Sequence, residues 1–412
     1  MDEINQINKD RIVVGLDIGN SKIGVFIGQI EDHEQVRVLG FASNELKKGE
    51  ANELEAIVNC LELSIRQAEN LTGIDVCDVY VGISGNHIRS IAGRGTVSLL
   101  RSGNEVTEQD IELAVEQAKS IQISADQEII HCLVGNFTVD EQGGIKNPIG
   151  MSGMRLTAEV QLVTAKAGAL ANIRKSVERV GLHIVSMVLE PLASAFAILL
   201  EDEKELGVAV IDIGAESTDV IIFQGDVVCY TVSLNFAGNN VTNDIAIYFK
   251  TPKDRAEEIK KKYGTVMFSN LLEEEMVPVP GVGGREETPH KREILARIIN
   301  ERMKEIFNLI SEDIERKKLN KVIGAGFVLT GGGSSIEGLV ELAEKVFNAP
   351  VRRGTPQKSM GLGESIAMPS YSTGVGLLNY GAKHYKPSAR DKVPNFAKSA
   401  FRKALGFLKN IF

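Results

Sequence analysis

One short pattern occurs twice in the sequence, and this repeat constrains the fold more than any other feature. Residues 12–28 read IVVGLDIGNSKIGVFIG, and residues 207–223 read GVAVIDIGAESTDVIIF. An offset of 195 residues aligns Asp17 with Asp212, together with the Ile-Gly pair that follows each aspartate. Each copy is an apolar run, a tight polar turn and a second run rich in β-forming residues, which is typical of a β-hairpin. Two such hairpins predict two related α/β lobes that face each other.

Helical patterns follow the hairpins in both halves. Residues 53–71 carry apolar side chains at helical spacing. Residues 169–180 are expected to form a second helix, ended by Gly181. Residues 190–200 (EPLASAFAILL) are apolar nearly all round, which predicts a helix buried between layers.

Two stretches interrupt the pattern of the lobes. Residues 83–166 contain short strands, several glycines and one helix near 107–120. Residues 245–320 are helical and charged, with a Gly/Pro loop at 277–284. We expect each stretch to form an inserted subdomain.

The two Asp-Ile-Gly turns predict a phosphate site. A turn with glycine at its tip directs several backbone N–H groups the same way, and such groups bind phosphate oxygens. In the first copy these groups belong to residues 19–21, and Lys22 adds a positive charge. Asp17 and Asp212 would face the same cleft. Because carboxylates repel phosphate, we expect Mg²⁺ and its waters to lie between them.

A glycine-rich segment at residues 328–347, VLTGGGSSIEGLVELAEKVF, predicts a third part of this site. A strand runs into three glycines that let a ligand approach closely. The helix expected after them has Ser334 and Glu337 in capping-box spacing. An ordinary strand-to-helix turn is the alternative. The sequence contains no GxxxxGK[ST] motif, which excludes a P-loop ATPase.

Composition excludes several other classes of protein. The net charge of −9, the absence of Trp and an aromatic content of 5% argue against a nucleic-acid partner. The four cysteines are far apart and show neither zinc nor disulfide spacing. The longest apolar stretch, residues 182–200, contains His, Glu and Pro, so we expect no transmembrane span. Residues 1–10 lack the features of a signal peptide.

The two turns and the glycine-rich loop, in this order, resemble the superfamily of actin, Hsp70 and sugar kinases. Five stretches narrow the resemblance: ELGVAVIDIGAESTDV, FAGNNVTNDIA, AEEIKKKYG, FVLTGGGSSIEGL and PSYSTGVGLLNYG. Together they are similar to the FtsA family of bacterial cell-division proteins. The resemblance covers residues 11–384 and the C-terminal helix, which is nearly the whole chain.

The resemblance implies an actin-like α/β fold of two lobes, with ATP and Mg²⁺ between them. It places subdomain 1A at 1–82 and 167–200, subdomain 1C at 83–166, subdomain 2A at 201–244 and 321–384 (with a return to 1A), subdomain 2B at 245–320, a linker at 385–394 and an amphipathic helix at 395–412.

The resemblance also implies which residues contact the nucleotide. The phosphate contacts fall on Asp17, Gly19, Asn20, Ser21, Lys22, Asp212, Gly214, Ser217, Gly238 and Asn239. The nucleoside contacts fall on Glu257, Lys260, Gly331, Gly332, Gly333 and Ser334. Asp17 and Asp212 would hold Mg²⁺ through water. An E-x-x-K spacing puts both side chains on one helix face, although a solvated ion pair has the same spacing.

The partners implied are the tail of the tubulin-like protein FtsZ, further copies of the chain in a filament, anionic lipids and, through subdomain 1C, other division proteins. The implied place is the cytoplasmic face of the membrane at the division site. The FtsZ tail would contact Asn243, Arg302 and Glu305. Taken alone, the last two would be interpreted as a solvated charge pair.

The second turn departs from the family pattern Asp-Ile-Gly-Gly-Gly-Thr. Ala215 adds a Cβ, and Glu216 adds a carboxylate beside a polyanion. We therefore expect weak or absent hydrolysis. The sequence identifies no residue that would activate water.

Residues 395–412, NFAKSAFRKALGFLKNIF, predict an amphipathic helix with four basic and no acidic side chains. A helix docked on its own protein or in a partner's groove has the same periodicity. The single sign of charge, the four Phe residues and a preceding Pro-containing linker favour a membrane surface. The residues expected to contact the membrane are Phe396, Lys398, Phe401, Arg402, Lys403, Leu405, Phe407, Leu408, Lys409, Ile411 and Phe412.

Three other functions fit parts of the pattern. A sugar kinase would need a catalytic carboxylate for a sugar, and none is evident. An Hsp70-like chaperone would need a peptide-binding domain after residue 385. A scaffold of type IV pili resembling PilM remains the main alternative, together with an ATPase of this fold that forms no filament.

Overall fold

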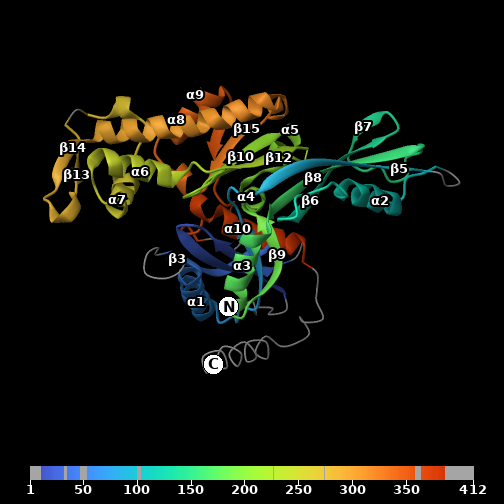
Figure 1. Ribbon diagram of the computed structural model, residues 1–412, viewed down its shortest axis with the longest axis horizontal. Helices are drawn as coiled ribbons and strands as arrows, with labels where there is room; N and C mark the ends of the chain where they lie inside the picture. The colour runs from blue at the N-terminus through green and yellow to red at the C-terminus, as the bar shows by residue number, and fades with distance from the viewer. Residues whose placement is uncertain are drawn as a thin grey trace, which may run out of the picture.

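The computed structural model describes residues 11–31, 35–46, 53–99, 104–225, 227–272, 274–357 and 363–385. The predicted membrane helix at 395–412 lies outside these residues. Two five-stranded sheets form the centres of two lobes, which Figure 1 shows one above the other. This arrangement confirms the two α/β lobes predicted from the repeat.

The two sheets have the same topology. The first has the order β3-β2-β1-β4-β9 and the second the order β12-β11-β10-β15-β16. In each, two hairpin connections join antiparallel strands and the remaining strands are parallel. The strands of the first are β1 (Ile12–Ile18), β2 (Lys22–Ile30), β3 (Val36–Glu45), β4 (Asp78–Ile83) and β9 (His183–Leu189), and those of the second are β10 (Val208–Ile213), β11 (Thr218–Gln224), β12 (Val227–Leu234), β15 (Gly326–Thr330) and β16 (Val351–Arg353).

The register of the two hairpins also repeats. Asp17 of β1 is opposite Gly24 of β2, and Asp212 of β10 is opposite Asp219 of β11. The second copy therefore carries an additional carboxylate beside its turn.

Four helices and a short 3₁₀ turn complete the first lobe: α1 (Glu53–Thr72), α3 (Ala167–Arg179), α4 (Glu190–Ile198), η7 (Pro369–Tyr371) and α10 (Ser372–Lys383). Helix α10 comes from the far end of the chain and packs against α4 and β1. A Cβ at Gly376 would lie 1.8 Å from the carbonyl oxygen of Ala193, so glycine permits this close approach.

Helix α4 lies between the two lobes, as its apolar sequence predicted. Its buried residues share one hydrophobic cluster with α10 and with strands β10 and β11 of the second sheet. The lobes are therefore joined through this helix.

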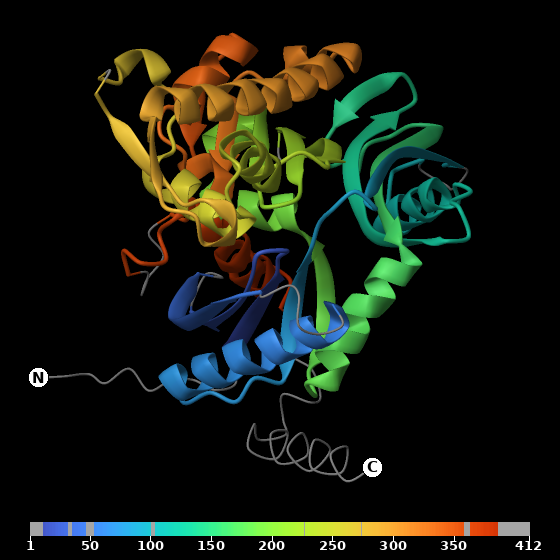
Figure 2. The same ribbon diagram turned by 60° about the vertical axis from the view of Figure 1, so that its left-hand side comes forward.

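The first insertion is a four-stranded antiparallel sheet with one helix. The strand order is β5-β8-β6-β7, and the unit projects to one side of the lobes in Figures 1 and 2. Its elements are β5 (Arg89–Ser98), α2 (Glu108–Lys119), β6 (Gln127–Val139), β7 (Gln142–Ile145) and β8 (Arg155–Lys166). A capping box between Thr107 and Asp110 begins α2.

The second lobe contains the remaining elements: α5 (Glu201–Leu206), α6 (Gly238–Phe249), α7 (Lys253–Tyr263), η3 (Phe268–Asn270), β13 (Met276–Val279), η4 (Val282–Gly284), β14 (Thr288–Lys291), α8 (Arg292–Arg316), η5 (Leu319–Val322), η6 (Gly332–Ser335) and α9 (Leu339–Phe347). A single hydrophobic cluster joins the sheet to α6, α7, α8 and α9. The second insertion is therefore packed continuously against its lobe.

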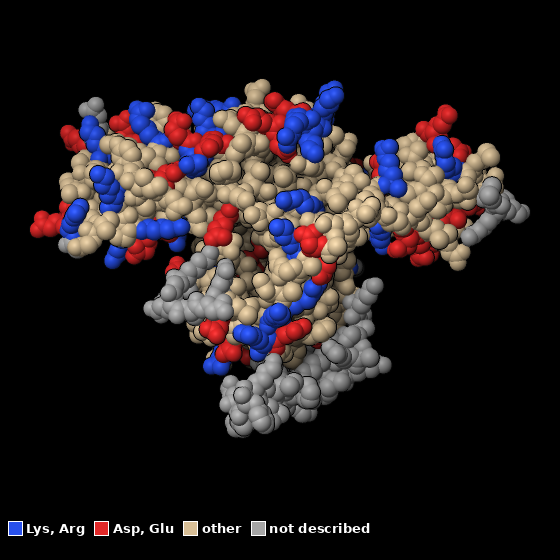
Figure 3. All heavy atoms as spheres, in the orientation of Figure 1, with Lys and Arg blue, Asp and Glu red and all other residues tan. Residues whose placement is uncertain are grey.

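Two surface features are relevant to function. Within the described part of the chain, no helix combines the length and the apolar character needed to cross a bilayer. On the face shown in Figure 3, basic and acidic side chains are interspersed over the coloured residues.

Candidate functional site

The first hairpin turn is closed by a backbone hydrogen bond at its glycine. The Gly19 amide donates to the carbonyl of Lys22 at 3.0 Å. This amide is therefore engaged within the turn, and the contact of Gly19 with phosphate stays a prediction. Asp17, at the end of β1, is buried beside this turn.

Lys22 lies between the carboxylates of the two lobes. Its ammonium donates to the carbonyl of Ser370 at 2.7 Å and lies 4.0 Å from the centre of the Tyr371 ring. Burial lowers the pKa of Lys22, while the charges of Asp17 and Asp212 oppose that shift. One cation therefore interacts with an aspartate from each copy of the repeat.

The second turn is braced by the start of helix α6. The Gly214 amide donates to Ser217 at 2.9 Å, as in the first turn. The amides of Gly238 and Asn239 donate to the carbonyls of Gly214 and Ala215, at 3.1 and 2.7 Å. The amides of Gly238 and Asn239 therefore join the start of α6 to the turn, and contacts of Gly214, Gly238 and Asn239 with phosphate stay predictions.

The departure from the family pattern in this turn leaves the cleft largely unaffected. Glu216 is exposed to solvent, unlike its buried neighbour Ser217. The hydroxyl of Ser217 donates to Asp219 at 2.8 Å. The charge repulsion expected from Glu216 is therefore reduced by solvent screening.

Four carboxyl groups from the two lobes influence one another's pKa, and three of them, Asp17, Asp212 and Asp219, are buried. Burial raises the pKa of Asp17 to about 6, with Lys22 opposing and Asp212 adding to the shift. Burial raises the pKa of Asp212 as well, and raises that of Asp219 to about 6. The pKa of Glu190 lies well above its ordinary value because of burial and the nearby charge of Asp17.

Sequence reasoning missed Glu190 and Asp219. Glu190 was noted only as the residue that begins a buried helix, although a carboxylate directly before an apolar helix differs in character from all the residues that follow it. Asp219 replaces Gly24 of the first repeat, and a closer comparison of the two copies would have found it.

The carboxylates fit a hydrated cation better than a protein-made metal cage. Among the described residues, no group of three or more His, Cys, Asp or Glu is arranged to hold a metal ion. Mg²⁺ usually keeps several waters and takes one or two carboxylates together with phosphate oxygens. Asp17 and Asp212, two buried carboxyl groups with raised pKa values, match the number of protein ligands that this chemistry requires.

Asp212 is held in place by the other lobe. The hydroxyl of Ser194, on α4, donates to its carboxylate at 2.6 Å. Ser194 in turn lies 3.0 Å from the hydroxyl of Thr373 on α10. The carboxylate is therefore oriented by two helices of the first lobe.

The glycine-rich loop closes against Asp212. At Gly331 the φ angle is +82°, and a Cβ there would lie 2.3 Å from a carboxylate oxygen of Asp212 and 2.6 Å from the carbonyl of Ile213. The Gly331 amide donates to Pro369 at 3.2 Å. Only glycine permits both this conformation and this approach.

The helix after the loop begins differently from our prediction. Residues Gly332–Ser335 form a 3₁₀ turn, and α9 begins at Leu339 after Gly338, whose φ angle is +77°. The buried hydroxyl of Ser334 donates to the carbonyl of Gly331 at 2.8 Å. The predicted capping box of Ser334 with Glu337 does not form, because the serine is used within the loop.

Glu257 and Lys260 lie on one face of α7, as their spacing predicts. Their ion pair is 2.6 Å long, and the Lys260 ammonium also donates to the carbonyl of Gly238 and the hydroxyl of Thr242, at 2.9 and 2.8 Å. The Lys260 side chain is only 11% exposed. The pair therefore fixes α7 to the start of α6 and is not a solvated surface pair.

The three residues expected to bind a partner gather where α6 and α8 pack. Arg302 forms a two-point ion pair with the carboxylate of Asp244, at 2.6 and 3.0 Å, and also bonds to Glu305. Asn243 precedes Asp244 on α6. Sequence reasoning missed Asp244, because its partner lies 58 residues away in the chain.

Comparison with known families agrees with this geometry. The model of the family described as "Cell division protein FtsA" matches residues 209–376, and the model of the SHS2 domain inserted in that family matches residues 85–164. The second range corresponds to the four-stranded insertion.

Curated relatives are similar over most of the chain. The cell division protein FtsA of Pseudomonas aeruginosa is 41% identical over 378 residues, covering 91% of this chain and 90% of that protein. The protein of the same name from Escherichia coli is 38% identical over 385 residues, covering 91% of each.

Two solved structures share the fold at low identity. A chain of a PilM–PilN type IV pilus biogenesis complex aligns with a TM-score of 0.62 and 18% identity, covering 90% of this chain and 98% of that one. MreB5 of Spiroplasma citri bound to ADP aligns with a TM-score of 0.52 and 14% identity, covering 91% and 97%. The fold is therefore actin-like.

Proposed function

The chain belongs to the FtsA family of cell division proteins, and we propose that it binds ATP between its lobes and fixes FtsZ filaments to the cytoplasmic membrane. The observation that carries the nucleotide part is the electrostatic interaction of Lys22 with both Asp17 and Asp212, the aspartates of the two copies of the hairpin. Support comes from the shared fold of MreB5, whose structure contains ADP.

Asp17 and Asp212 would hold Mg²⁺ through water, and the ion would neutralise charge on the phosphates. Asn20, Ser21 and Lys22 of the first turn would face the phosphates. The residues we propose for the other contacts are Ser217, Glu257, Gly331, Gly332, Gly333 and Ser334. Because Gly19, Gly214, Gly238 and Asn239 use their amides within the protein, we assign them the shape of the turns and not direct hydrogen bonds to phosphate.

We propose that hydrolysis is slow. Glu190, the first residue of α4, is the carboxyl group we propose to accept a proton from water, because its charge interacts with that of Asp17. Its raised pKa means that it holds its proton more tightly than an ordinary glutamate, which disfavours its action as a base.

The FtsZ tail would bind where α6 and α8 meet, on Asn243, Arg302 and Glu305. Arg302 is oriented there by Asp244 and so presents a fixed guanidinium to a peptide.

Membrane attachment would depend on the amphipathic sequence 395–412. Four basic side chains near an anionic leaflet contribute at most about 4 kcal/mol, so one copy would bind reversibly. Association of several copies makes each later contact intramolecular and strengthens attachment greatly. Polymerisation with ATP would therefore bring FtsZ to the membrane.

A scaffold of type IV pili is the second candidate, because the PilM–PilN chain has a similar fold. That likeness shows the fold alone. The two candidates differ in their peptide partner, so binding of an FtsZ tail peptide and not a pilus peptide separates them.

Liposome co-sedimentation tests the anchoring. Full-length protein should pellet with anionic vesicles, and Mg-ATP should increase the fraction pelleted. Protein ending at residue 394 should stay in solution. Phe401→Ser, on the apolar face, should weaken binding strongly, whereas Asn410→Ser on the polar face serves as the matched control. Equal pelleting of the full-length and shortened proteins would show that the tail is not the anchor.

A further inference from the structure

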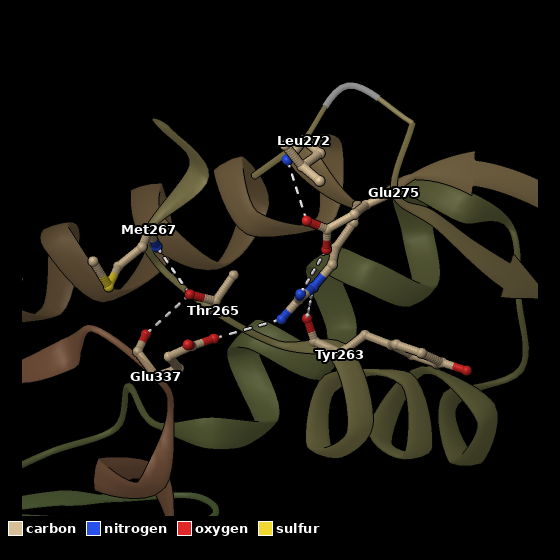
Figure 4. Close-up of polar contacts among 7 residues, drawn as sticks. Tyr263, Thr265, Met267, Leu272, Glu275 and Glu337 are labelled. Carbon is tan, nitrogen blue, oxygen red and sulfur yellow. Dashed lines mark hydrogen bonds and ion pairs between the residues drawn. The ribbon is translucent and has the colours of Figure 1, made fainter. Parts of the chain in front are cut away.

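Arg292, the first residue of helix α8, joins three separate segments of the second lobe. Its Nε donates to the carbonyl of Tyr263 at 3.0 Å, Nη1 to Glu275 at 2.8 Å and Nη2 to Glu337 at 3.5 Å. Figure 4 shows Tyr263, Glu275 and Glu337 converging from different elements. The Arg292 side chain is 24% exposed, so the solvent screens these contacts only in part.

Two of the three segments carry residues proposed to contact the nucleoside. Tyr263 ends α7, the helix of Glu257 and Lys260. Glu337 follows the loop of residues 331–334 and precedes α9.

The same two segments also meet through their backbones. The Val266 amide and the Thr265 hydroxyl both donate to the carbonyl of Glu337, at 3.0 and 3.3 Å. Figure 4 shows the hydrogen bond from Thr265 to the Glu337 carbonyl, and also the hydrogen bond that the Met267 amide donates to the Thr265 hydroxyl. The walls of the proposed nucleoside site are therefore linked at a single junction.

Helix α8 itself leads from Arg292 toward the proposed peptide site. Arg292 and Arg302 lie on the same helix, ten residues apart, which is about 15 Å along the axis. The helix is continuous and packs in one core with α6, α7 and α9. A displacement of its first turn would therefore reach the surface around Arg302.

We propose that Arg292 is a positioning residue that couples nucleotide binding to tail-peptide binding in this protein. The inference rests on the proposed function. Nucleotide that draws α7 and the glycine-rich loop together moves Tyr263 and Glu337, and the guanidinium transmits that shift to α8. Coupling of this kind is reciprocal, so the peptide changes nucleotide affinity by the same factor.

The experiment compares peptide binding with and without nucleotide. The dissociation constant of an FtsZ C-terminal tail peptide is measured on the full chain, alone and with saturating Mg-AMPPNP. The ratio of the two constants is the coupling factor. The variants are Arg292→Gln and, as a matched control, Arg297→Gln, whose arginine is on the same helix and pairs with Glu293.

We expect a coupling factor of about fivefold or more in the unmodified protein. Arg292→Gln should lower it to less than about twofold while changing peptide affinity without nucleotide by less than about twofold. Arg297→Gln should keep the original factor. A purely structural role for Arg292 would lower stability and leave the factor unchanged.

Two further variants keep the inference testable if Arg292→Gln folds poorly. Arg292→Lys keeps the charge but lacks the planar fork, so it should give an intermediate factor. Glu337→Gln removes the negative charge that pairs with Arg292, and because Glu337 is 65% exposed the variant should fold normally and reduce the factor in part.

A coupling factor of one in the unmodified protein, or an unchanged factor in both Arg292→Gln and Glu337→Gln, would overturn the inference. Failure of the unmodified protein to bind AMPPNP or the peptide is a different result. It would overturn the proposed function, and the coupling with it.

Discussion

Ser194 of the first lobe donates a 2.6 Å hydrogen bond to Asp212 of the second lobe. The hydroxyl and the carboxylate are both buried, and helix α4 supplies the hydroxyl from between the two sheets. The orientation of one repeat's aspartate is therefore controlled by the other lobe.

Ser194→Ala tests this control. A hydrogen bond to a charged group contributes about 1.5–3 kcal/mol, so we expect affinity for Mg-ATP to fall about 10-fold or more as Asp212 loses its orientation. Isothermal titration with Mg-AMPPNP measures the change. Ser176→Ala is the matched control, since that buried hydroxyl donates only to the carbonyl of Asn172 on its own helix. Equal affinity in the two variants would show that Thr373 alone suffices to orient Asp212.

Gly331→Ala should prevent closure of the glycine-rich loop. The new Cβ would meet Asp212 and Ile213 at less than 3 Å, and alanine at a positive φ adds about 1–2 kcal/mol of backbone strain. We expect a lower melting temperature and loss of nucleotide binding. Gly332→Ala should leave the melting temperature nearly unchanged, because the nearest atom to its Cβ lies 3.9 Å away. If both variants melted like the original protein, the loop would be able to move away from Asp212.

His131→Gln should change how stability depends on pH. The buried ring accepts a hydrogen bond from the Leu189 amide at 3.0 Å, and burial lowers the pKa of His131 from 6.5 to about 4. A depressed pKa means that the neutral form is favoured in the folded state. The contribution of His131 to the free energy of unfolding is complete above pH 6.5. It is lost as the pH falls toward 4, by up to about 3 kcal/mol.

Urea unfolding at pH 7.5 and pH 5 measures the effect of His131→Gln. The raised pKa values of Asp17 and Asp219 act in the opposite direction over the same range, so the informative quantity is the difference between the two proteins. We expect the variant to lose less stability on acidification. Parallel pH profiles would show that His131 does not titrate in this interval.

Asp244→Ala should weaken binding of the FtsZ tail peptide, although Asp244 is not among the residues proposed to contact the peptide. The carboxylate holds the guanidinium of Arg302 at two points, and its removal frees that side chain. We expect peptide affinity to fall about 3- to 10-fold, because the Arg302 side chain must then be ordered on binding, which costs about 0.5–1.5 kcal/mol. This loss should be smaller than that caused by Arg302→Ala. Glu258→Ala, whose partner Arg255 lies on the exposed face of α7, provides the control in a fluorescence polarisation assay. An affinity equal to that of the control would remove Asp244 from the site.

The lobes could be predicted because their signal is local and occurs twice. Alternating apolar residues and the Asp-Ile-Gly turns specify each hairpin, and the 195-residue offset relates the two. The buried helix α4 was predicted for the same reason, since its composition shows its surroundings directly.

The details of the site depend on contacts that no local pattern contains. The amides of Gly238 and Asn239 are used by a turn more than 20 residues earlier, and Lys22 bonds to Ser370 from the other end of the chain. The predicted capping box at Ser334 failed because the hydroxyl found a closer acceptor at Gly331. The electrostatic influence of Glu190 on Asp17 depends on how the strands and helices of the lobes pack, whereas Asp219 could have been found by comparing the two repeats.

The position of α10 has a consequence for biosynthesis. Strand β1 is translated long before residues 372–383, the helix against which it packs. The first lobe therefore cannot finish folding until residue 383 has been translated. The second lobe, whose sheet ends at Arg353, can be completed earlier, so the usual order of folding from the N-terminus is reversed. A chain broken off before α10 would display an uncovered sheet, which quality-control proteases can recognise.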